Sequence, residues 1–178
     1  MTAYDKIYEV AADNYGIITA SEAKSLGVSK KALFQLVARG KLERRGYGVY
    51  RLASHRLPSE YDQYAEAVAL VGDGAYVSGE SVLALLDLAL VNPEKMTVST
   101  PKRNRRTLPA WLTVVKSSED KEVRYYKGIP CESLPEAFLF CRGRVPIERL
   151  VDGIEKAERN GDFRLGEADI LRKEFSND

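Results

Sequence analysis

The stretch that decides the fold of the N-terminal region covers residues 41–52 and reads KLERRGYGVYRL. Two short runs that alternate between apolar and polar side chains flank a turn that contains Gly46 and Gly48. This pattern is typical of a β-hairpin, because alternate side chains of a strand point to opposite faces and glycine accepts the backbone conformations of a tight turn. We therefore expect a two-stranded hairpin here.

Three helices are predicted ahead of this hairpin. Apolar side chains at helical spacing indicate a first helix over residues 3–14. A capping box that begins at Thr19 starts a second helix over about 20–26. Ser29 is suited to cap a third helix over residues 30–39. With a short extended pair of isoleucines after the first helix, this order of elements is typical of a winged helix-turn-helix.

The rest of the chain mixes helical and extended patterns. Helices are predicted over about 60–71, 79–90, 146–159 and 165–175, with a further one after a capping box at Ser133–Glu136. Strands are predicted at Met96–Thr100, Leu112–Lys116 and Val123–Tyr126. We therefore expect an α+β protein: a winged helix-turn-helix domain of residues 1–56, then a mixed α/β second domain of residues 57–178. Pro58 and Ser59 are typical of the linker between them.

Charge is strongly segregated along a chain whose net charge is only +1. Residues 20–56 contain nine basic and two acidic side chains, and residues 95–131 contain nine basic and three acidic ones. Between them, residues 57–94 contain seven acidic side chains and no Lys or Arg. Two concentrated positive blocks in a nearly neutral protein favour a polyanionic partner.

The third predicted helix presents two different faces at about 100° per residue. Its apolar face consists of Leu33, Leu36 and Val37. Its opposite face consists of Lys31, Gln35, Ala38 and Arg39, with Phe34 at the border. Arg and Lys can donate to guanine, Gln can pair with adenine, and a helix N-terminus can meet a phosphate. The candidate DNA-reading residues are Ser29, Lys30, Lys31, Gln35 and Arg39.

The hairpin would form the wing. Arginine on such an element is attracted to the DNA backbone or to the minor groove. The candidate contacts are Lys41, Arg44, Arg45, Tyr47 and Arg51. The alternative interpretation of helix and wing together is a solvated basic face on a domain that only contacts proteins.

A second basic cluster falls in a predicted loop and consists of Lys102, Arg103, Arg105 and Arg106. It is either a second nucleic-acid contact or a solvated loop without a role. The sequence does not decide between these alternatives.

Signals for catalysis are weak. The chain has one histidine, His55, and two cysteines, Cys131 and Cys141, whose spacing is not that of a metal knuckle. No nucleophile elbow, phosphate-binding loop or dinucleotide fingerprint is present. We therefore expect no enzyme activity, no metal and no cofactor. Without a signal peptide or an apolar run near the roughly 18 residues of a membrane span, we expect a cytoplasmic protein with reduced cysteines.

Several segments resemble the AbiEi antitoxin family. In the first domain they are IITASEA at residues 17–23, GVS at 27–29, LVARGKLER at 36–44 and GVYR at 48–51. In the second domain they are YVSGESVL at 76–83 and GIPCESLPEA at 128–137. The second domain departs from the family at two places, with leucine at Leu85 or Leu86 where relatives often carry histidine, and with Cys131 and Glu132 where valine and threonine are common.

The resemblance implies an antitoxin encoded beside a nucleotidyltransferase-like toxin in an abortive phage infection system. It also implies a winged helix that binds double-stranded DNA repeats in its own promoter, and a second domain that neutralises the toxin without requiring a stable complex. Two alternatives remain open. One is a plain transcription factor whose second domain senses a ligand or dimerises, and the other is a nucleic-acid-processing enzyme.

Overall fold

The computed structural model describes residues 1–56 and 58–176 and divides into two compact units. The first unit consists of Met1–Asp73 together with the loop Asn104–Leu108. The second consists of Gly74–Arg103 and the chain from Pro109 onward. Both units combine helices with a β-sheet, so the predicted α+β class is confirmed.

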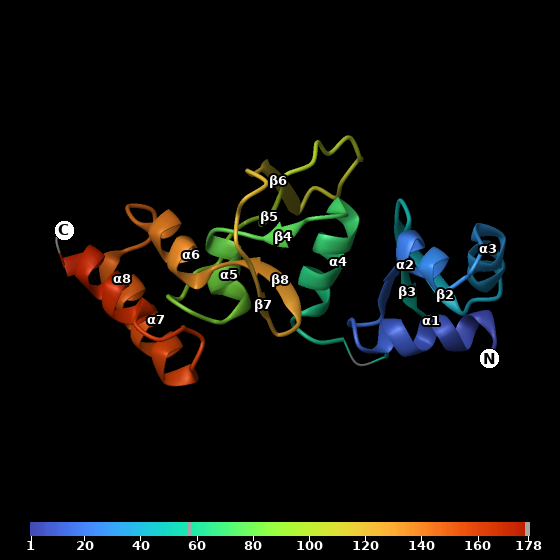
Figure 1. Ribbon diagram of the computed structural model, residues 1–178, viewed down its shortest axis with the longest axis horizontal. Helices are drawn as coiled ribbons and strands as arrows, with labels where there is room; N and C mark the ends of the chain where they lie inside the picture. Colours follow the sequence, from blue (N-terminus) through green and yellow to red (C-terminus); the bar gives the residue numbers. More distant parts are fainter. Residues whose placement is uncertain (57, 177–178) are drawn as a thin grey trace. The chain divides into compact units, whose positions relative to one another are not determined.

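The first unit begins with a winged helix-turn-helix (Figure 1). Its helices are α1 (Ala3–Ala12), α2 (Ala20–Ser25) and α3 (Lys30–Ala38). Its strands are β1 (Ile17–Thr19), β2 (Leu42–Gly46) and β3 (Val49–Leu52), which form an antiparallel sheet in the order β1-β3-β2. The predicted capping box is present, because the Thr19 side chain accepts from the Glu22 amide and the Glu22 carboxylate accepts from the Thr19 amide. The predicted three helices and hairpin are confirmed.

A small apolar core fixes the orientation of α3. Leu33 is 1% exposed and packs with Ile7 of α1, Ile18 of β1 and Leu42 of β2. Full burial of each such side chain contributes about 1.5–3 kcal/mol, so rotating α3 about its axis would be strongly unfavourable. The face of α3 opposite Leu33 is therefore held toward solvent.

Helix α4 (Asp62–Val71) also belongs to the first unit, where it contacts β1 and β3. It buries Ala65, Glu66 and Leu70. The compact unit thus extends to Asp73, beyond the predicted boundary between residues 56 and 57. Leu57 at that boundary lies outside the described residues, and the division into domains of residues 1–56 and 57–178 stays a prediction.

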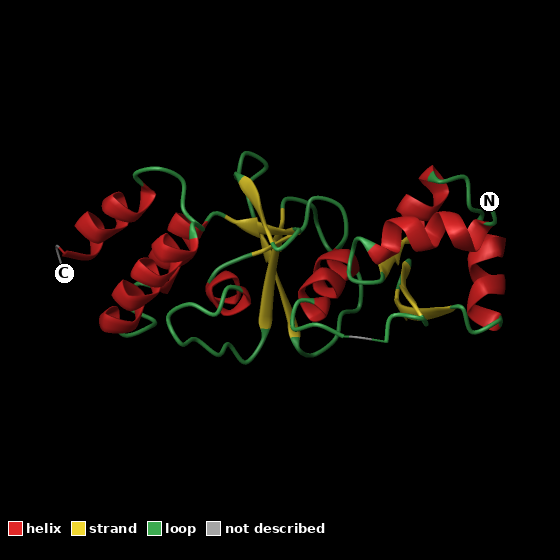
Figure 2. Ribbon diagram, turned by 90° about the horizontal axis from the view of Figure 1, so that it is seen from below, coloured by secondary structure: helices red, strands yellow, loops and turns green. Residues whose placement is uncertain are grey.

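The second unit contains a mixed five-stranded sheet in the order β6-β5-β4-β8-β7. Its strands are β4 (Tyr76–Val77), β5 (Met96–Thr100), β6 (Leu112–Lys116), β7 (Val123–Tyr126) and β8 (Ile129–Glu132). Its helices are α5 (Glu80–Leu85), α6 (Leu134–Cys141), α7 (Ile147–Asn160) and α8 (Glu167–Ser176). Figure 2 shows these helices gathered on one side of the unit's sheet. The three predicted strands are confirmed, and β4 and β8 are additional.

Helix α5 is shorter than the predicted helix over 79–90. The chain leaves the helical conformation after Leu85, and Asp87, Ala89 and Leu90 have φ angles between 49° and 57°. This turn approaches α7 closely, since a Cβ atom on Gly153 would lie 3.0 Å from the backbone nitrogen of Ala89. The prediction of a long helix was therefore wrong, because close packing between α7 and the turn overrides the apolar pattern.

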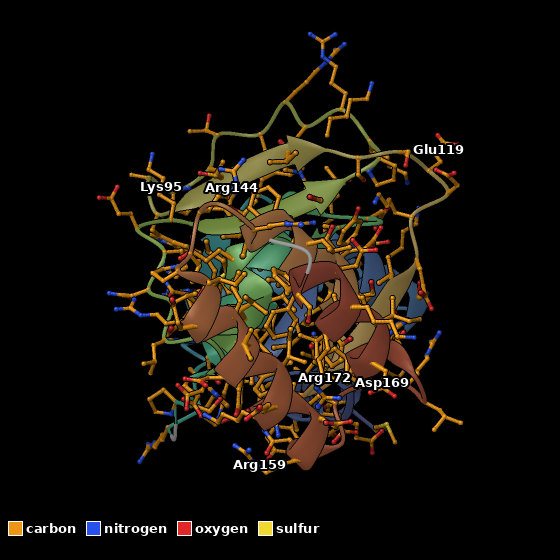
Figure 3. The ribbon with its side chains drawn as sticks, turned by 90° about the vertical axis from the view of Figure 1, so that its left-hand side faces the viewer. Lys95, Glu119, Arg144, Arg159, Asp169 and Arg172 are labelled. Carbon is orange, nitrogen blue, oxygen red and sulfur yellow. The ribbon has the colours of Figure 1, made fainter. Side chains whose placement is uncertain are left out.

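The C-terminal helices α7 and α8 pack against each other. Arg172 and Asp169 lie near each other on α8 in Figure 3, and their side chains are 2.9 Å apart. Arg172 also pairs with Glu158 of α7. These exposed pairs add little stability individually, so buried Leu150, Ile154 and Leu171 hold the two helices together.

Candidate nucleic-acid interface

The solvent face of α3 carries polar side chains without internal partners. Ser29 begins the helix, and its Oγ accepts from the Ala32 amide at 3.1 Å. Four further residues that the sequence predicts to contact DNA are exposed: Lys30, Lys31, Gln35 and Arg39. Among the described residues, none of these four side chains is engaged in a hydrogen bond or an ion pair. Their donors are thus available to a ligand.

The wing has a bulged hairpin with an exposed tip. The register of β2 against β3 shifts between Arg44 and Gly46. Arg44 is exposed, and its Nε donates to the Gly46 carbonyl at 3.3 Å. Tyr47 at the tip is 70% exposed. At the base of the wing, the Lys41 ammonium lies 5.7 Å from the centre of the Tyr4 ring.

Two wing arginines are paired inside the first unit. Arg45 donates from Nε to Oε1 of Glu66 at 2.8 Å and from Nη2 to Oε2 at 3.4 Å. The hydrogen bond to Glu66 raises the pKa of Arg45 above its ordinary value. Arg51 donates to the carboxylate of Glu43 at 2.7 Å, across the hairpin. These carboxylates offset much of the charge that the two arginines would offer to DNA.

One part of the second basic cluster lies at the wing. Arg106 donates from Nη1 to the Leu70 carbonyl at 3.0 Å, and its guanidinium lies 5.4 Å from the centre of the Tyr47 ring. The Arg106 amide donates to Oδ1 of Asn104 at 2.7 Å. Arg106 therefore joins the loop Asn104–Leu108 to the end of α4 and to the wing tip.

The other three residues of the second basic cluster are exposed to solvent. Arg105 is exposed and, within the part of the chain that the structure describes, its side chain has no hydrogen-bonding partner. Lys102 and Arg103 are exposed in the second unit. The structure thus brings Arg105 and Arg106 into the unit that contains α3 and the wing.

Sequence reasoning missed the partners of the wing arginines. The Glu43–Arg51 pair was foreseeable, because these residues lie opposite each other in the hairpin register. Glu66 gave no such signal, since it lies on the next helix at helical spacing among apolar residues. The stacking of Arg106 on Tyr47 joins positions far apart in sequence, and no local pattern predicts it.

Among the described residues, the cysteines and the histidine lie outside α3 and the wing. Cys131 and Cys141 are free and buried, and burial raises the pKa of each thiol to about 12. The single histidine, His55, contacts Asp62, with 2.7 Å between Nε2 and Oδ2. Over residues 1–56 and 58–176, no group of three or more His, Cys, Asp or Glu side chains is suited to hold a metal ion. None of the helices in these ranges is long and apolar enough to cross a membrane.

Comparisons with known proteins give a structural likeness and a family match. The chain is similar over most of its length to one solved structure, the RV2827C protein from Mycobacterium tuberculosis. That likeness has 14% sequence identity and a TM-score of 0.48, and it covers 93% of this chain and 69% of the other. No curated protein sequence matches the chain.

The sequence model of a family described as "Transcriptional regulator, AbiEi antitoxin" matches residues 5–53. The matched residues include all of α2, α3 and the wing, and most of α1. The description names both a transcriptional regulator and an antitoxin. The resemblance predicted from the sequence is therefore confirmed over residues 5–53, where the winged helix-turn-helix of this chain is similar to the AbiEi antitoxin family of transcriptional regulators.

Proposed function

We propose that the protein represses its own promoter by placing α3 in the major groove of repeated DNA sites. The observation that carries this proposal is the solvent face of α3, where Lys31, Gln35 and Arg39 are exposed and unpaired while Leu33 on the opposite face is buried. A helix with such a face fits the width of the major groove, where each base pair has its own pattern of donors and acceptors.

Each candidate residue has a proposed role. Gln35 reads adenine, while Lys31 and Arg39 contact guanine or phosphate, and Ser29 and Lys30 meet a phosphate at the start of the helix. In the wing and the adjacent loop, the side chains that point to solvent contact the DNA backbone: Lys41, Arg44, Tyr47 and Arg105. Arg45, Arg51 and Arg106 position these elements through their internal partners. Lys102 and Arg103 are further backbone contacts.

We also propose that the protein counters a nucleotidyltransferase-like toxin encoded beside it. The support is the matched family, whose description includes an antitoxin role. The family resemblance implies that the second domain, residues 57–178, neutralises the toxin. On this proposal neutralisation needs neither promoter binding nor a stable complex with the toxin.

A binding experiment tests the DNA-reading role. The full chain is titrated against labelled promoter duplex and against a scrambled duplex, and binding is followed by fluorescence anisotropy. Gln35→Ala should weaken promoter binding by about 1–3 kcal/mol and leave scrambled DNA nearly unaffected. Gln63→Ala is a matched control, because Gln63 is also exposed but lies on α4. Equal weakening on both duplexes would contradict the proposed orientation of α3.

A cellular experiment separates the two proposed activities. The full chain should repress a reporter fused to its own promoter, and it should restore growth when the neighbouring toxin gene is expressed. Gln35→Ala should lose repression and still restore growth. A variant that loses both together, while keeping its thermal stability, would mean that neutralisation acts through DNA binding.

A further inference from the structure

An aromatic ring lies exposed on the proposed reading face of α3. Phe34 is 57% exposed, whereas its neighbour Leu33 is 1% exposed. Within the described residues, Phe34 makes no ring–ring or cation–ring contact. Single apolar side chains are common on protein surfaces, so the exposure of Phe34 alone does not indicate a partner, and its position among the proposed reading residues carries the argument.

Helix geometry places this ring beside the reading residues. At about 100° per residue, Phe34 and Ala38 are neighbours on one stripe of the helix, and Lys31 and Gln35 share the same side. Phe34, Gln35 and Ala38 are all exposed. The face therefore combines a short apolar strip, an amide and a cation within about two turns.

The charge around the strip argues against a second copy of the chain as its partner. Lys30 and Lys31 lie within about one turn of Phe34 on the same short helix, Arg39 follows the last residue of the helix, and each is exposed. In a two-fold symmetric contact through this face, the same cations of both copies would oppose one another. Like charges at an interface are strongly unfavourable, whereas a polyanion matches them.

Duplex DNA offers one apolar group to such a strip. In the major groove, thymine alone among the four bases carries a methyl group, and Ala and Phe side chains contact it. We propose that Phe34, together with Ala38, recognises a thymine methyl group next to the base pair read by Gln35. This inference rests on the proposed promoter binding and adds to it that each repeated site contains an essential thymine.

The test removes that methyl group and nothing else. The full chain is titrated against promoter duplexes in which single thymines are replaced by deoxyuridine, which keeps the same base pairing. At one thymine in each repeated site, affinity should fall by about fourfold, the effect of taking one buried methyl group out of the contact. Phe34→Ala should weaken binding to the thymine duplex and show no further loss with deoxyuridine at that position.

Control variants separate a failure of this inference from a failure of the proposed function. Tyr8→Ala alters another exposed aromatic side chain, on α1, and should keep the full response to deoxyuridine. Because Phe34 is exposed, its replacement should leave the melting temperature unchanged. Promoter binding that ignores every deoxyuridine, or a Phe34→Ala variant that keeps the wild-type response, would overturn the inference and leave the proposed function intact. Equal affinity for promoter and scrambled duplexes would overturn both.

Discussion

Replacing Arg45 with methionine should destabilise the first unit by about 2 kcal/mol, the figure expected when one partner of a partly buried ion pair is removed. The change leaves the carboxylate of Glu66 without its partner at a site where the residue is only 8% exposed. For a fully buried pair the loss would be about 3–5 kcal/mol. The Arg45 side chain is 36% exposed, so water can approach the carboxylate and roughly half of that loss remains.

Thermal unfolding followed by circular dichroism measures this loss. For a domain of this size, about 2 kcal/mol corresponds to a fall in melting temperature of about 10 °C. Amide hydrogen exchange in β3 identifies the first unit as the part that is destabilised. Arg44→Met is the matched control, because Arg44 is the exposed neighbour on the same strand and its charge has no carboxylate partner among the described residues.

A double replacement tests the physical cause. Arg45→Met combined with Glu66→Leu leaves no unpaired charge and should regain most of the lost stability. DNA binding measured well below the melting temperature should be weakened by Arg44→Met much more than by Arg45→Met. Unchanged stability in Arg45→Met, together with a loss of DNA affinity as large as that of Arg44→Met, would refute the assignment of Arg45 to a structural role.

Three further predictions concern salt, backbone strain and pH. Promoter affinity should fall with salt on a log–log plot with a slope of about −0.9 per phosphate contacted, and Arg44→Ala should reduce the slope by about one contact; titrations between low and physiological salt measure this. Gly72→Ala should destabilise the first unit by about 1–3 kcal/mol, because φ is +107° and the new Cβ would lie 3.2 Å from Arg106 Nη1; a melting temperature equal to wild type would contradict it. Because burial raises the thiol pKa values of Cys131 and Cys141 from 9.0 to about 12, the unfolded state releases these protons first. The stability that the two protonated thiols contribute is therefore complete below about pH 8.5 and is lost as the pH rises toward 12. Denaturation curves measured across this range should show a smaller decrease in the free energy of unfolding when both cysteines are replaced by alanine.

The first domain could be predicted because its signals are local. Thr19 and Ser29 cap helices within three residues of themselves, and the alternation around Gly46 and Gly48 specifies a hairpin. The same holds for the strand Met96–Thr100, whose bounds the sequence predicts correctly. In each case the residues that form the element also determine its hydrogen bonds.

Other parts depended on partners far along the chain. Strand β4, Tyr76–Val77, is only two residues long and exists because β5 and β8 pair with it on either side. The turn after Leu85 depends on how closely α7 approaches. Nothing near β4 or this turn in the sequence contains that information.

The candidate site divides in the same way. The solvent face of α3 could be predicted, since helical spacing alone separates Gln35 from Leu33. Which wing arginines remain available could not, because Glu66 reaches Arg45 from the following helix. Counting basic residues therefore supports a hypothesis about the kind of ligand, but it does not give the share of each arginine in binding that ligand.

The stacking of Arg106 on Tyr47 bears on how this domain could be inherited or transplanted. The wing tip depends on side chains from a loop encoded far downstream, in Asn104–Leu108, and its Arg45 depends on Glu66 beyond the matched segment. A single crossover that moved residues 5–53 into another gene would deliver the reading helix without the groups that support the wing. The winged helix of this protein is therefore not a self-contained cassette, and substitutions at Tyr47, Glu66 and Arg106 should be coupled during evolution.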